Sequence, residues 1–416
     1  MRIAIIGAGV SGLVAAHVLK RAYDVTVFDA RAKAGGHANT VRIDTPYETH
    51  HVDTGFIVYN EPNYPNFTRL LAALGVATQP STMTFSVHDA MGRFEYSTTL
   101  PRGLYATSSH LLRPSFQRML ADYLRFRHAA HRFLRDARSG DVRAMSDFIE
   151  ESRFSRMFVE RLLVPLGASI WSADRTRFLD FPARYVLAFF NNHGLINTRG
   201  RPRWRTVSGG SDRYVEAMVR QLGDRMRVQQ PVERVKRREH DVVVRLRGGH
   251  EMEFDRVVMA THSDQTLRLL ADTSPQERHI LAAFPYQINE TVLHTDRRLL
   301  PRRRAAWAAW NYHLPVDPEQ TTSVTYHMNR LQSLRAEREF CVTTNPGPEL
   351  DESLVIRRVR YEHPLYTAAS SLAQQQRHTI NGVNRTYFCG AYWGTGFHED
   401  GVNSGLAVAA LLGQHL

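Results

Sequence analysis

The first thirty positions of the chain alternate between short apolar runs and a glycine-containing turn. Residues 2–6 (RIAII) form an apolar run of strand length, and residues 13–22 (LVAAHVLKRA) place apolar side chains at helical spacing. Residues 24–30 (DVTVFDA) alternate as a half-buried strand does. We therefore predict a strand, a glycine turn, a helix and a second strand at the start of the chain.

By hydrophobic period, the rest of the chain divides into a largely helical middle and a strand-rich second half. Residues 63–75 and most of 101–205 predict helices, and residues 82–99 predict a hairpin. Ser211 is the expected cap of a helix over 211–222. Short strands are predicted at 227–239, 241–249, 250–260, 290–296, 321–328, 339–344, 354–363 and 386–392, and a final helix at 401–412. The first three of these strands would form a meander that returns to the first sheet, so the segments interleave into two lobes.

At 416 residues, the chain has the composition of an ordinary soluble globular protein with two or three domain cores. Cys341 and Cys389 are far apart and lack metal-ligand spacing, so we expect neither a disulfide nor a metal site. This favours a reducing, cytoplasmic compartment. Glycines interrupt the apolar N-terminus and no cleavage site follows, which argues against an export signal. No segment has about 18 uninterrupted apolar residues, so no membrane-spanning helix is expected.

The net charge of +12 comes mainly from arginine, which supplies 50 of the 53 basic residues. Such a charge attracts polyanions, either nucleic acid or an anionic membrane surface. No helix-turn-helix, zinc-finger or RNA-binding signature is present, so nucleic acid is not an expected partner. Residues 113–138 and 297–310 are arginine-rich, and the second stretch adds two tryptophans. They are candidates for peripheral contact with the inner face of a membrane, and the alternative is a solvated surface.

The glycine-rich turn after the first strand carries the clearest chemistry. It is a GxGxxG pattern, and an acidic residue ends the second strand about 20 residues later. The first glycine turns the chain, the second lets the backbone approach a pyrophosphate, and the third packs the helix on the sheet. The helix N-terminus would face the phosphates, and the acidic side chain would accept hydrogen bonds from a ribose. The predicted dinucleotide site consists of Gly7, Gly9, Val10, Ser11, Gly12 and Asp29.

The run that begins at this acidic residue resembles the flavin-containing amine oxidase superfamily. Residues 29–37 (DARAKAGGH) match its pattern of an acidic residue, a basic residue, two glycines and a second basic residue. Similar segments follow at 52–55 (VDTG), 208–211 (SGGS), 231–233 (PVE) and 255–261 (DRVVMAT). The resemblance implies noncovalently bound FAD. It implies contacts from Asp29, Ala30, Lys33, Gly35, Gly36, His37, Gly55, Phe56 and the backbone of Val232.

The fold implied by this resemblance is α/β, with a Rossmann-type FAD-binding domain interleaved with a mixed α+β substrate domain. The FAD-binding segments would be residues 1–75, 205–275 and 381–416. The substrate domain would comprise a largely helical segment, 76–204, and a strand-rich segment, 276–380.

The C-terminal segment resembles the family's last strand and helix. The helix would begin under the flavin ring, where its positive end stabilises negative charge at the N1–O2 edge of the reduced ring. Ala391 stands where the family has an acidic residue, so the usual ribityl contact is absent or comes from elsewhere. The residues that carry this resemblance are Gly390, Asp400, Gly401, Val402 and Ser404.

A narrower resemblance runs nearly end to end. It is carried by DTGFIVYN, PLGASIWSAD, NETVLHTD, WAAWNYH and GFHEDGV. These segments are similar to bacterial FAD-dependent oxidoreductases associated with cyclopropane-fatty-acyl-phospholipid synthases. The similarity implies a lipid substrate and a lipid methyltransferase as a possible partner.

The family's amine oxidases usually place a lysine near flavin N5, and none of the three lysines here is expected there. The corresponding strand begins at Asn289. His398 occupies the position of a family cage aromatic, and it is a candidate for proton transfer beside the flavin. The alternative is a histidine held by the surrounding loop. Candidate walls of the substrate pocket are Tyr59, Trp171, Asn289, Tyr392 and Trp393.

We therefore expect an FAD-dependent oxidoreductase that acts on an apolar substrate, most simply a fatty acyl chain of phospholipid. The reaction would be dehydrogenation or double-bond isomerisation, with hydride transfer to flavin N5. The alternatives are oxidation of a hydrophobic amine, desaturation of an isoprenoid or porphyrinogen, and a non-catalytic role beside a lipid methyltransferase.

Overall fold

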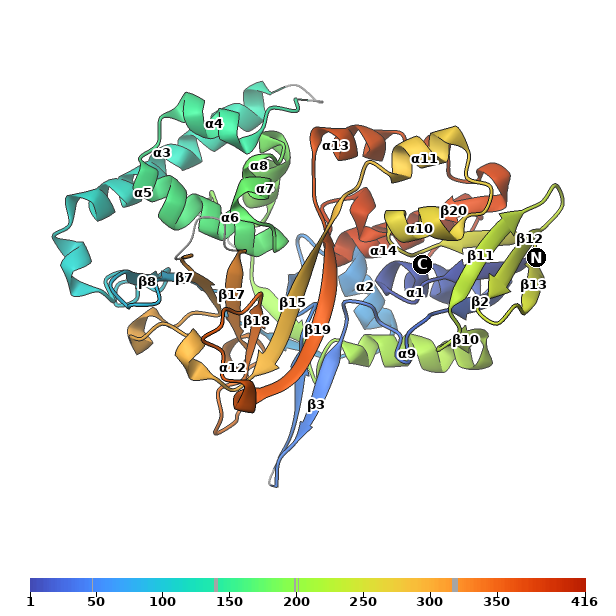
Figure 1. Ribbon diagram of the computed structural model, residues 1–416, viewed down its shortest axis with the longest axis horizontal. Helices are drawn as coiled ribbons and strands as arrows, with labels where there is room; N and C mark the ends of the chain where they lie inside the picture. Colours follow the sequence, from blue (N-terminus) through green and yellow to red (C-terminus); the bar gives the residue numbers. More distant parts are fainter. Residues whose placement is uncertain (47, 138–140, 198–199, 201, 316–320) are drawn as a thin grey trace.

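A computed structural model describes residues 1–46, 48–137, 141–197, 200, 202–315 and 321–416. Figure 1 shows a parallel sheet with its helices on the right and a helical lobe on the left, with the long strands β15 and β19 between them. The helices are α1 (Val10–Leu19), α2 (Pro65–Ala73), α3 (Pro114–Asp136), α4 (Met145–Ser152), α5 (Arg156–Phe158), α6 (Val164–Trp171), α7 (Arg175–Leu179), α8 (Ala183–Asn192), α9 (Asp212–Leu222), α10 (Ser263–Leu269), α11 (Pro275–Leu281), α12 (Met328–Leu331), α13 (Ala368–Gln375) and α14 (His398–Leu411).

Within the described residues the strands belong to five sheets. The two large sheets are the parallel sheet β10-β2-β1-β14-β20 and the mixed sheet β19-β15-β18-β17-β16-β7-β8. The strands of the first are β1 (Arg2–Ile6), β2 (Asp24–Phe28), β10 (Met226–Arg227), β14 (Arg256–Met259) and β20 (Thr386–Phe388). Those of the second are β7 (Phe85–His88), β8 (Glu95–Ser97), β15 (Tyr286–His294), β16 (Trp310–His313), β17 (Ser323–His327), β18 (Cys341–Thr344) and β19 (Val355–Pro364). The small sheets contain β3 (Thr40–Asp44), β4 (Thr49–Asp53), β5 (Tyr59–Asn60), β6 (Thr78–Pro80), β9 (Trp204–Val207), β11 (Val232–Arg237), β12 (Val242–Leu246) and β13 (Glu251–Phe254).

The parallel sheet is covered on both faces, as its apolar strands require. Ile3 and Ile5 of β1 pack into one core with α1, α2, α9 and α14. Ala4 and Ile6 point to the other face, into a core shared with β11, β12, α10 and α11. Alternate residues of one strand therefore fill two different cores, because side chains in a strand point to opposite faces.

The helical lobe surrounds an aromatic core. Phe116, Phe126, Phe158, Phe178 and Phe190 are fully buried there, together with Trp171. Strands β7, β16 and β17 border the same core through Val87, Tyr312 and Val324. The mixed sheet thus connects the helical lobe to the rest of the molecule.

Most of the predicted elements are confirmed, including the initial strand–turn–helix–strand, the meander that returns to the first sheet, and the final helix. The hairpin over 82–99 is confirmed as β7 and β8, but β7 also pairs in parallel with β16, which sequence periodicity did not reveal. The predicted helical stretch 101–205 is helical only from α3 onward, because residues 98–113 form turns and a short 3₁₀ helix. Its residues 138–140, 198–199 and 201 lie outside the described residues.

Ser211 is the N-cap residue of α9, as predicted, but it does not cap the helix with its side chain. Instead, its backbone N–H and hydroxyl both donate to Asp53 of β4, at 2.8 and 2.9 Å. Asp53 also accepts from Thr40 and Gln332, so a buried carboxylate ties α9 to β3, β4 and the segment after α12.

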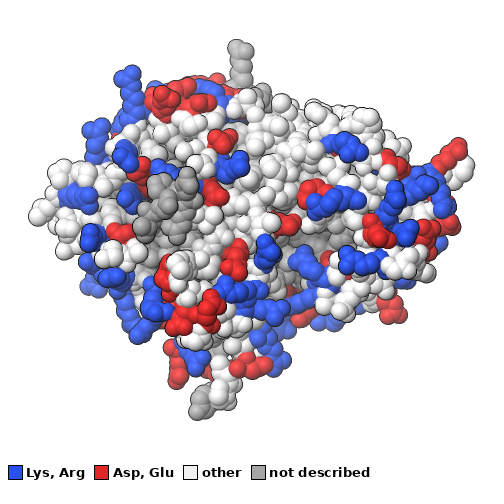
Figure 2. Space-filling view, in the orientation of Figure 1, with Lys and Arg blue, Asp and Glu red and all other residues white. Residues whose placement is uncertain are grey.

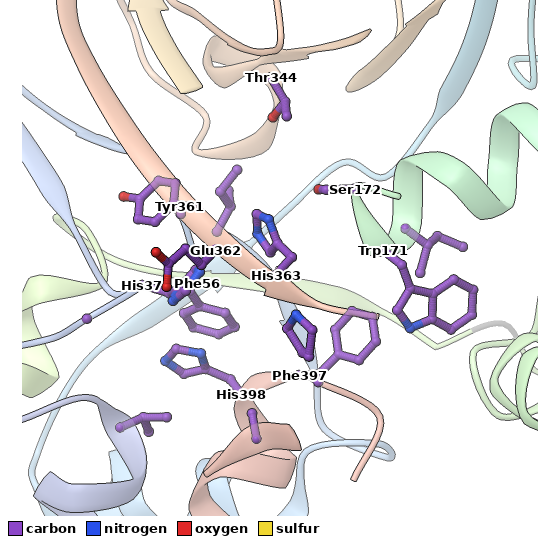
Figure 3. Close-up of a pocket in the computed structure, with 18 of the residues that line it drawn as sticks. His37, Phe56, Trp171, Ser172, Thr344, Tyr361, Glu362, His363, Phe397 and His398 are labelled. Carbon is purple, nitrogen blue, oxygen red and sulfur yellow. The ribbon is translucent and has the colours of Figure 1, made fainter. Parts of the chain in front are cut away.

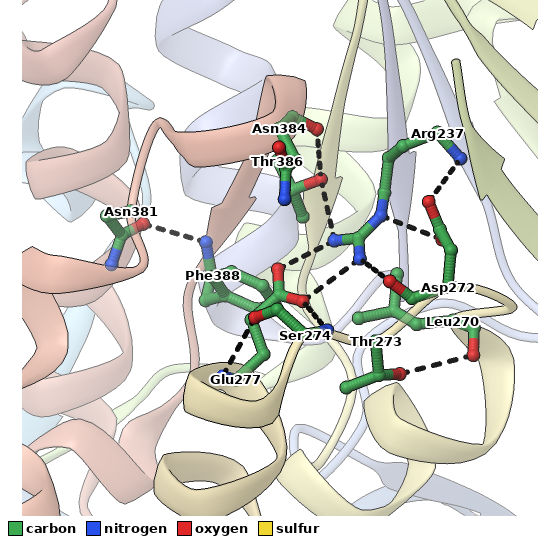
Figure 4. Close-up of polar contacts among 10 residues, drawn as sticks. All are labelled: Arg237, Leu270, Asp272, Thr273, Ser274, Glu277, Asn381, Asn384, Thr386 and Phe388. Atoms are coloured by element: carbon green, nitrogen blue, oxygen red, sulfur yellow. Dashed lines mark hydrogen bonds and ion pairs between the residues drawn. The ribbon is translucent and has the colours of Figure 1, made fainter. Parts of the chain in front are cut away.

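A buried arginine joins the two helices behind the parallel sheet to the strand β11. Arg237 donates to both carboxylate oxygens of Glu277, at 2.6 and 2.9 Å, and to Asp272 at 2.9 Å (Figure 4). Although burial alone would raise it, the pKa of Glu277 is lowered, because the guanidinium of Arg237 stabilises the carboxylate. Glu277 also closes the capping box of α11 with Ser274.

We expect Glu277→Gln to lower the free energy of unfolding by about 3 kcal/mol, because removing one member of a buried ion pair leaves the other uncompensated. Urea unfolding of both proteins at the same FAD concentration measures this. The matched control is Glu290→Gln, which removes a surface pair with Arg358 and should cost less than about 1 kcal/mol. Equal losses of unfolding free energy in the two variants would mean that Asp272 alone compensates the charge of Arg237.

Candidate functional site

The glycine-rich turn between β1 and α1 forms one wall of a large cavity. Gly7 has φ +105°, and a Cβ there would lie 2.8 Å from the carbonyl oxygen of Ala260. A Cβ on Gly12 would lie 2.0 Å from the carbonyl oxygen of Gly7, so this glycine permits the tight turn itself. Gly9 differs, because a Cβ there would meet nothing within 4 Å. The space beside Gly9 belongs to the cavity, where a ligand can approach the backbone.

A second loop lies against this turn. The N–H of Gly35 donates to the carbonyl oxygen of Ala8 at 2.8 Å, and a Cβ on Gly36 would lie 3.2 Å from Cα of Gly9. Asp29 lies at the base of both loops and accepts from the N–H groups of Ala8 and Arg31, at 2.9 and 2.8 Å. The two loops therefore present their backbones and a carboxylate to the same space.

The last helix reaches this site from the other end of the chain. A Cβ on Gly401 would lie 2.5 Å from Cγ1 of Val10, and one on Gly405 would lie 2.5 Å from the carbonyl oxygen of Ser11. Helices α1 and α14 therefore cross closely near their N-termini, and both positive helix ends lie at the cavity. Ser404 accepts from the N–H of Gly390 at 2.9 Å, which joins α14 to the segment after β20.

The cavity has a volume of about 1450 Å³. This exceeds the roughly 300–1000 Å³ of a site for one ligand, so there is room for a cofactor and a substrate. We call the part lined by the two loops, residues 230–232, 260–269 and 390–392 the cofactor arm. We call the part lined by described residues between 83 and 204 the apolar arm. The cofactor arm fits a dinucleotide, because it combines an open glycine backbone, helix N-termini and a carboxylate.

The lining brings together many of the predicted site residues. These are Gly7, Gly9, Val10, Ser11, Asp29, Ala30, Gly35, Gly36, His37, Gly55, Phe56, Trp171, Val232, Gly390, Tyr392 and His398. They come from six separate stretches of sequence, which supports the expectation that these stretches share a ligand. Their individual roles stay predictions.

The other predicted site residues lie outside the lining. The Lys33 ammonium pairs with Asp212 and donates to the carbonyl oxygen of Thr40 at 3.1 Å, so it is directed away from the cavity. The rings of Tyr59 and Trp393 do not form pocket walls, because they pack into the cores on either side of the parallel sheet. Asn289 is buried behind the lining, and Gly12, Gly401, Val402 and Ser404 lie at or behind the contact of α1 with α14.

Asp400 and its neighbour Glu399 act as helix caps. Asp400 Oδ2 accepts from the N–H groups of Thr395 and Phe397, both at 2.9 Å, and so closes the loop before its own helix. Glu399 accepts from the N–H groups of Asn66 and Phe67, both at 2.9 Å, at the start of α2. These two carboxylates fix the position of the N-terminus of α14.

His398 is held by aromatic neighbours. Its ring lies parallel to that of Phe56 with centroids 3.6 Å apart (Figure 3). Its Nε2 is 2.6 Å from the hydroxyl of Tyr214. Burial lowers the pKa of His398 to about 3, so the ring is neutral at pH 7. This favours His398 as a neutral partner rather than as an acid, and a catalytic role for it stays a prediction.

Sequence reasoning missed several lining residues. Phe397 stacks on Phe189 with ring centroids 4.7 Å apart, beside Trp171. The sequence motif had marked its neighbour, His398, as the candidate site residue. His363 on β19 faces the cavity and had no motif to mark it (Figure 3). The aliphatic residues of the apolar arm could have been found from the sequence, because they repeat at four-residue spacing and so share a helix face. They are Leu120 and Leu124 in one stretch and Leu162, Leu166 and Ile170 in another.

Comparison with known proteins gives a consistent result. A model of the flavin containing amine oxidoreductase family matches residues 10–322. A putrescine oxidase bound to putrescine aligns over 99% of both chains, with 16% identity and a TM-score of 0.68. Cyclohexylamine oxidase from Brevibacterium oxydans IH-35A shows 15% identity and a TM-score of 0.67, over 99% of this chain and 98% of that one. A CLA-producing fatty acid isomerase from P. acnes shows 14% identity, the same coverage and a TM-score of 0.67. At these identities the structural similarity shows a shared fold.

The open space beside Gly9 leads to a prediction. Gly9→Ala should leave folding of the FAD-free protein unchanged, because φ at Gly9 is an ordinary −73° and the added Cβ meets no protein atom. It should weaken FAD binding by about tenfold or more, because the methyl group enters the space of the pyrophosphate. Thermal unfolding without FAD and titration with FAD measure the two effects.

The contrasting variant is Gly12→Ala, whose Cβ would collide with the turn and should destabilise the FAD-free protein as well. If Gly9→Ala bound FAD as tightly as the unchanged protein, the phosphates would lie elsewhere in the cavity.

Proposed function

This chain belongs to the flavin-containing amine oxidoreductase family and is an FAD-dependent oxidoreductase, and we propose that its substrate is an apolar chain, a fatty acyl group of phospholipid. The observation that carries the proposal is the chemistry of the apolar arm. The described lining residues between 83 and 204 include no Asp, Glu, Lys or Arg. An uncharged hydrocarbon loses nothing by entering such a space, whereas a charged group loses its hydration.

The reaction proposed is dehydrogenation or double-bond isomerisation of the chain. FAD, when bound, supplies a hydride acceptor for the first and a temporary hydride store for the second. The chain's own contribution is to hold the hydrocarbon in place and to exclude water at the junction of the two arms. Trp171, Phe189 and Phe397 form an aromatic wall suited to both tasks.

The main alternative is oxidation of a hydrophobic amine. The overall similarity to putrescine and cyclohexylamine oxidases is as great as that to the fatty acid isomerase, so fold alone does not separate the alternatives. The site argues against the amine. The three lysines of the chain lie outside the cavity lining, and the apolar arm offers an ammonium group no carboxylate among its described residues.

The narrower resemblance to flavoproteins associated with cyclopropane-fatty-acyl-phospholipid synthases agrees with this proposal. It adds a lipid methyltransferase as a proposed partner. A non-catalytic role beside that partner differs from the enzyme proposal in one measurable way, because the flavin would then never be reduced by lipid.

The mouth of the apolar arm indicates how a lipid would enter. Leu100 and Leu124 line the cavity and are also 73% and 54% exposed, so the arm opens to solvent between them. Leu111 and Leu112, in the loop between β8 and α3, are exposed as well, Leu112 to 87%. Exposed leucines beside an apolar opening are typical of a surface that contacts a membrane.

The charge of the same region complements an anionic bilayer. Residues 97–135 contain seven arginines and one acidic residue, Asp122, which is paired with Arg125. In Figure 2 this end of the molecule, on the left as in Figure 1, shows basic side chains around an uncharged surface. We propose that this mouth surface, residues 97–125, rests on the membrane.

The second arginine-rich stretch, 297–310, does not suit that role. Trp307 is buried and donates through Nε1 to the carbonyl oxygen of Pro301 at 2.6 Å, and Trp310 is only partly exposed. Arg298 and Arg303 pair with Asp296 and Glu95. The indoles are therefore unavailable to lipid headgroups. None of the helices in the described part of the chain combines the length and apolarity that a membrane span requires.

The substrate proposal is tested by the visible spectrum of the FAD-bound protein under anaerobic conditions, with phospholipid vesicles added. Unsaturated acyl chains should bleach the oxidised flavin if they are dehydrogenated, and chromatography of the lipids should reveal isomers if the flavin stays oxidised. Leu166→Arg should lower either rate by at least about tenfold without loss of FAD, because it places a charge in the apolar arm.

Leu372→Arg is the matched control, since Leu372 is 51% exposed on α13 and does not line the cavity. Bleaching by hydrophobic amines, with lipids unchanged, would support the amine alternative and contradict the acyl proposal. Bound flavin that no lipid reduces or alters would support the non-catalytic role.

The membrane proposal predicts that the protein co-sediments with anionic vesicles more strongly than with zwitterionic ones, and less at high salt. Leu112→Glu should weaken this binding by about tenfold. It removes the roughly 1.5 kcal/mol of free energy gained by burying a leucine side chain in the membrane, and it adds a negative charge. Leu411→Glu, at another exposed leucine on α14, should bind as the unchanged protein does. Equal losses for the two variants would place the contact elsewhere.

A further inference from the structure

Strands β15 and β19 bring two polar side chains together behind the junction of the cofactor and apolar arms. Asn289 of β15 is fully buried, and its Nδ2 lies 2.9 Å from Nδ1 of His363 on β19. His363 lines the cavity. Figure 3 shows it between the group formed by His37, Phe56 and Tyr361 and the group formed by Trp171, Ser172 and Phe397.

The orientation of the Asn289 amide is fixed by backbone groups. Its Nδ2 donates to the carbonyl oxygen of Ser172 at 2.9 Å, and a carbonyl can only accept. Its Oδ1 accepts from Gln287 at 3.1 Å and from Asn345 at 2.8 Å. Those two amides are themselves oriented by the backbone, because Gln287 Oε1 accepts from the N–H of Asp174 and Asn345 Oδ1 accepts from the N–H of Glu290.

The orientation of Asn289 determines the tautomer of His363. Because Asn289 donates to Nδ1, that nitrogen must carry a lone pair, and the proton of the neutral ring is on Nε2. Among the described residues no hydrogen bond involves Nε2, and Nε2 is not one of the buried unpaired nitrogens, so it is accessible from the cavity that His363 lines. Burial in the cavity wall, together with nearby His262, lowers the pKa of His363 to about 4, so the ring is neutral at pH 7.

We propose that His363 is a neutral hydrogen-bond donor, locked as the Nε2–H tautomer by Asn289, that binds an acceptor atom at the junction of the two arms. The acceptor is a lone pair on oxygen or nitrogen, either at the flavin edge or on the acyl carbonyl. The tautomer is a property of the protein alone, whereas the acceptor rests on FAD binding if it is on the flavin and on the proposed acyl substrate if it is the carbonyl.

A neutral donor suits a position beside the uncharged apolar arm. It can hold a polar atom in one place, and it brings no cation into a space that offers no counter-ion in the apolar arm. Asn289 lies on the strand that corresponds, by the family resemblance, to the one that carries a lysine in the amine oxidases. In this chain that strand carries a positioning residue, and the donor belongs to the neighbouring strand.

The first test measures the tautomer directly by nuclear magnetic resonance of protein labelled with ¹⁵N in histidine, with the His363 signals assigned from His363→Gln. We expect a neutral ring with the proton on Nε2 from pH 5.5 to 8, with or without FAD. A proton on Nδ1, or a charged ring at pH 7, would overturn the proposal.

Asn289→Asp tests the lock. The new carboxylate would accept from Nδ1–H, so the pKa of His363 should rise toward neutrality and its signals should titrate between pH 5.5 and 8. Other titratable groups face this ring: His37, His262, Tyr361 and Glu362, which pairs with His262. Their own titration would appear in the unchanged protein too, so only titration gained in Asn289→Asp counts as support. An unchanged tautomer in a folded Asn289→Asp protein would mean that Asn289 is not the lock.

The second test identifies the acceptor. His363→Leu removes the donor and His363→Gln keeps an N–H donor. If the acceptor is on the flavin, His363→Leu shifts the absorption maximum and midpoint potential of bound FAD, and His363→Gln restores most of the shift. If the acceptor is on the substrate, His363→Leu leaves the flavin unchanged and lowers kcat/KM by about 100-fold, with partial rescue by His363→Gln.

His378→Leu is the control, because His378 is exposed and lies outside the cavity lining. An FAD spectrum, potential and kcat/KM all unchanged in His363→Leu would overturn the proposal. Because the spectrum and the tautomer need no lipid, this failure is distinguishable from a failure of the acyl assignment.

Discussion

The close crossing of α1 and α14 is the constraint on which the site depends. Neither helix could approach the other as it does with a side chain at Gly401 or Gly405, since a Cβ at either would come within 2.5 Å of α1. This crossing brings the glycine-rich turn near the start of the chain and the first turn of the last helix to one site. It also explains why the C-terminal segment is rich in glycine and in capping carboxylates: Asp400 and Glu399 position the helix start, and the glycines let it reach α1. Two helix N-termini therefore face the same cavity, and their dipoles add where the cofactor's negative charge is expected.

The two arms of the cavity differ in their electrostatics, because different secondary-structure elements line them. The cofactor arm is made of loops at the carboxyl ends of parallel strands, where the N-terminus of α1 and Asp29 lie at the cavity. The apolar arm is made of helix faces and of the mixed sheet, whose backbone groups are already bonded to one another. A polar ligand is thus stabilised in the first arm, and only an uncharged one is tolerated in the second. The junction between them is the place where a flavin ring and a hydrocarbon can meet.

Local sequence rules predicted the parts of the fold that depend on local physics. The turn at Gly7, the helix after it and Asp29 form one short supersecondary unit, so spacing alone was sufficient. The parallel pairing of β7 with β16 joins residues more than 200 positions apart, and no periodicity encodes it. The same holds for the site. Phe397 and His363 line the cavity because of how distant strands and helices pack together. Tyr59 and Trp393 do not line it, because their rings are packed into the hydrophobic cores. Aromatic residues are good core formers, so residue type by itself could not separate a wall from a core.

Three of the five histidines in the described cavity lining are alike in their protonation state. His37, His363 and His398 all have pKa values lowered first of all by burial, so none carries a charge at neutral pH. Each ring nitrogen is then either a donor or an acceptor. For His363 the neighbour that decides which is Asn289, whereas the hydroxyl of Tyr214 beside His398 can donate or accept. A lysine or arginine at these positions would keep its charge and would require a carboxylate or water nearby. Neutral histidines let polar contacts exist beside a hydrocarbon at little electrostatic cost, which is why a cavity with an uncharged arm can still orient the atoms that react.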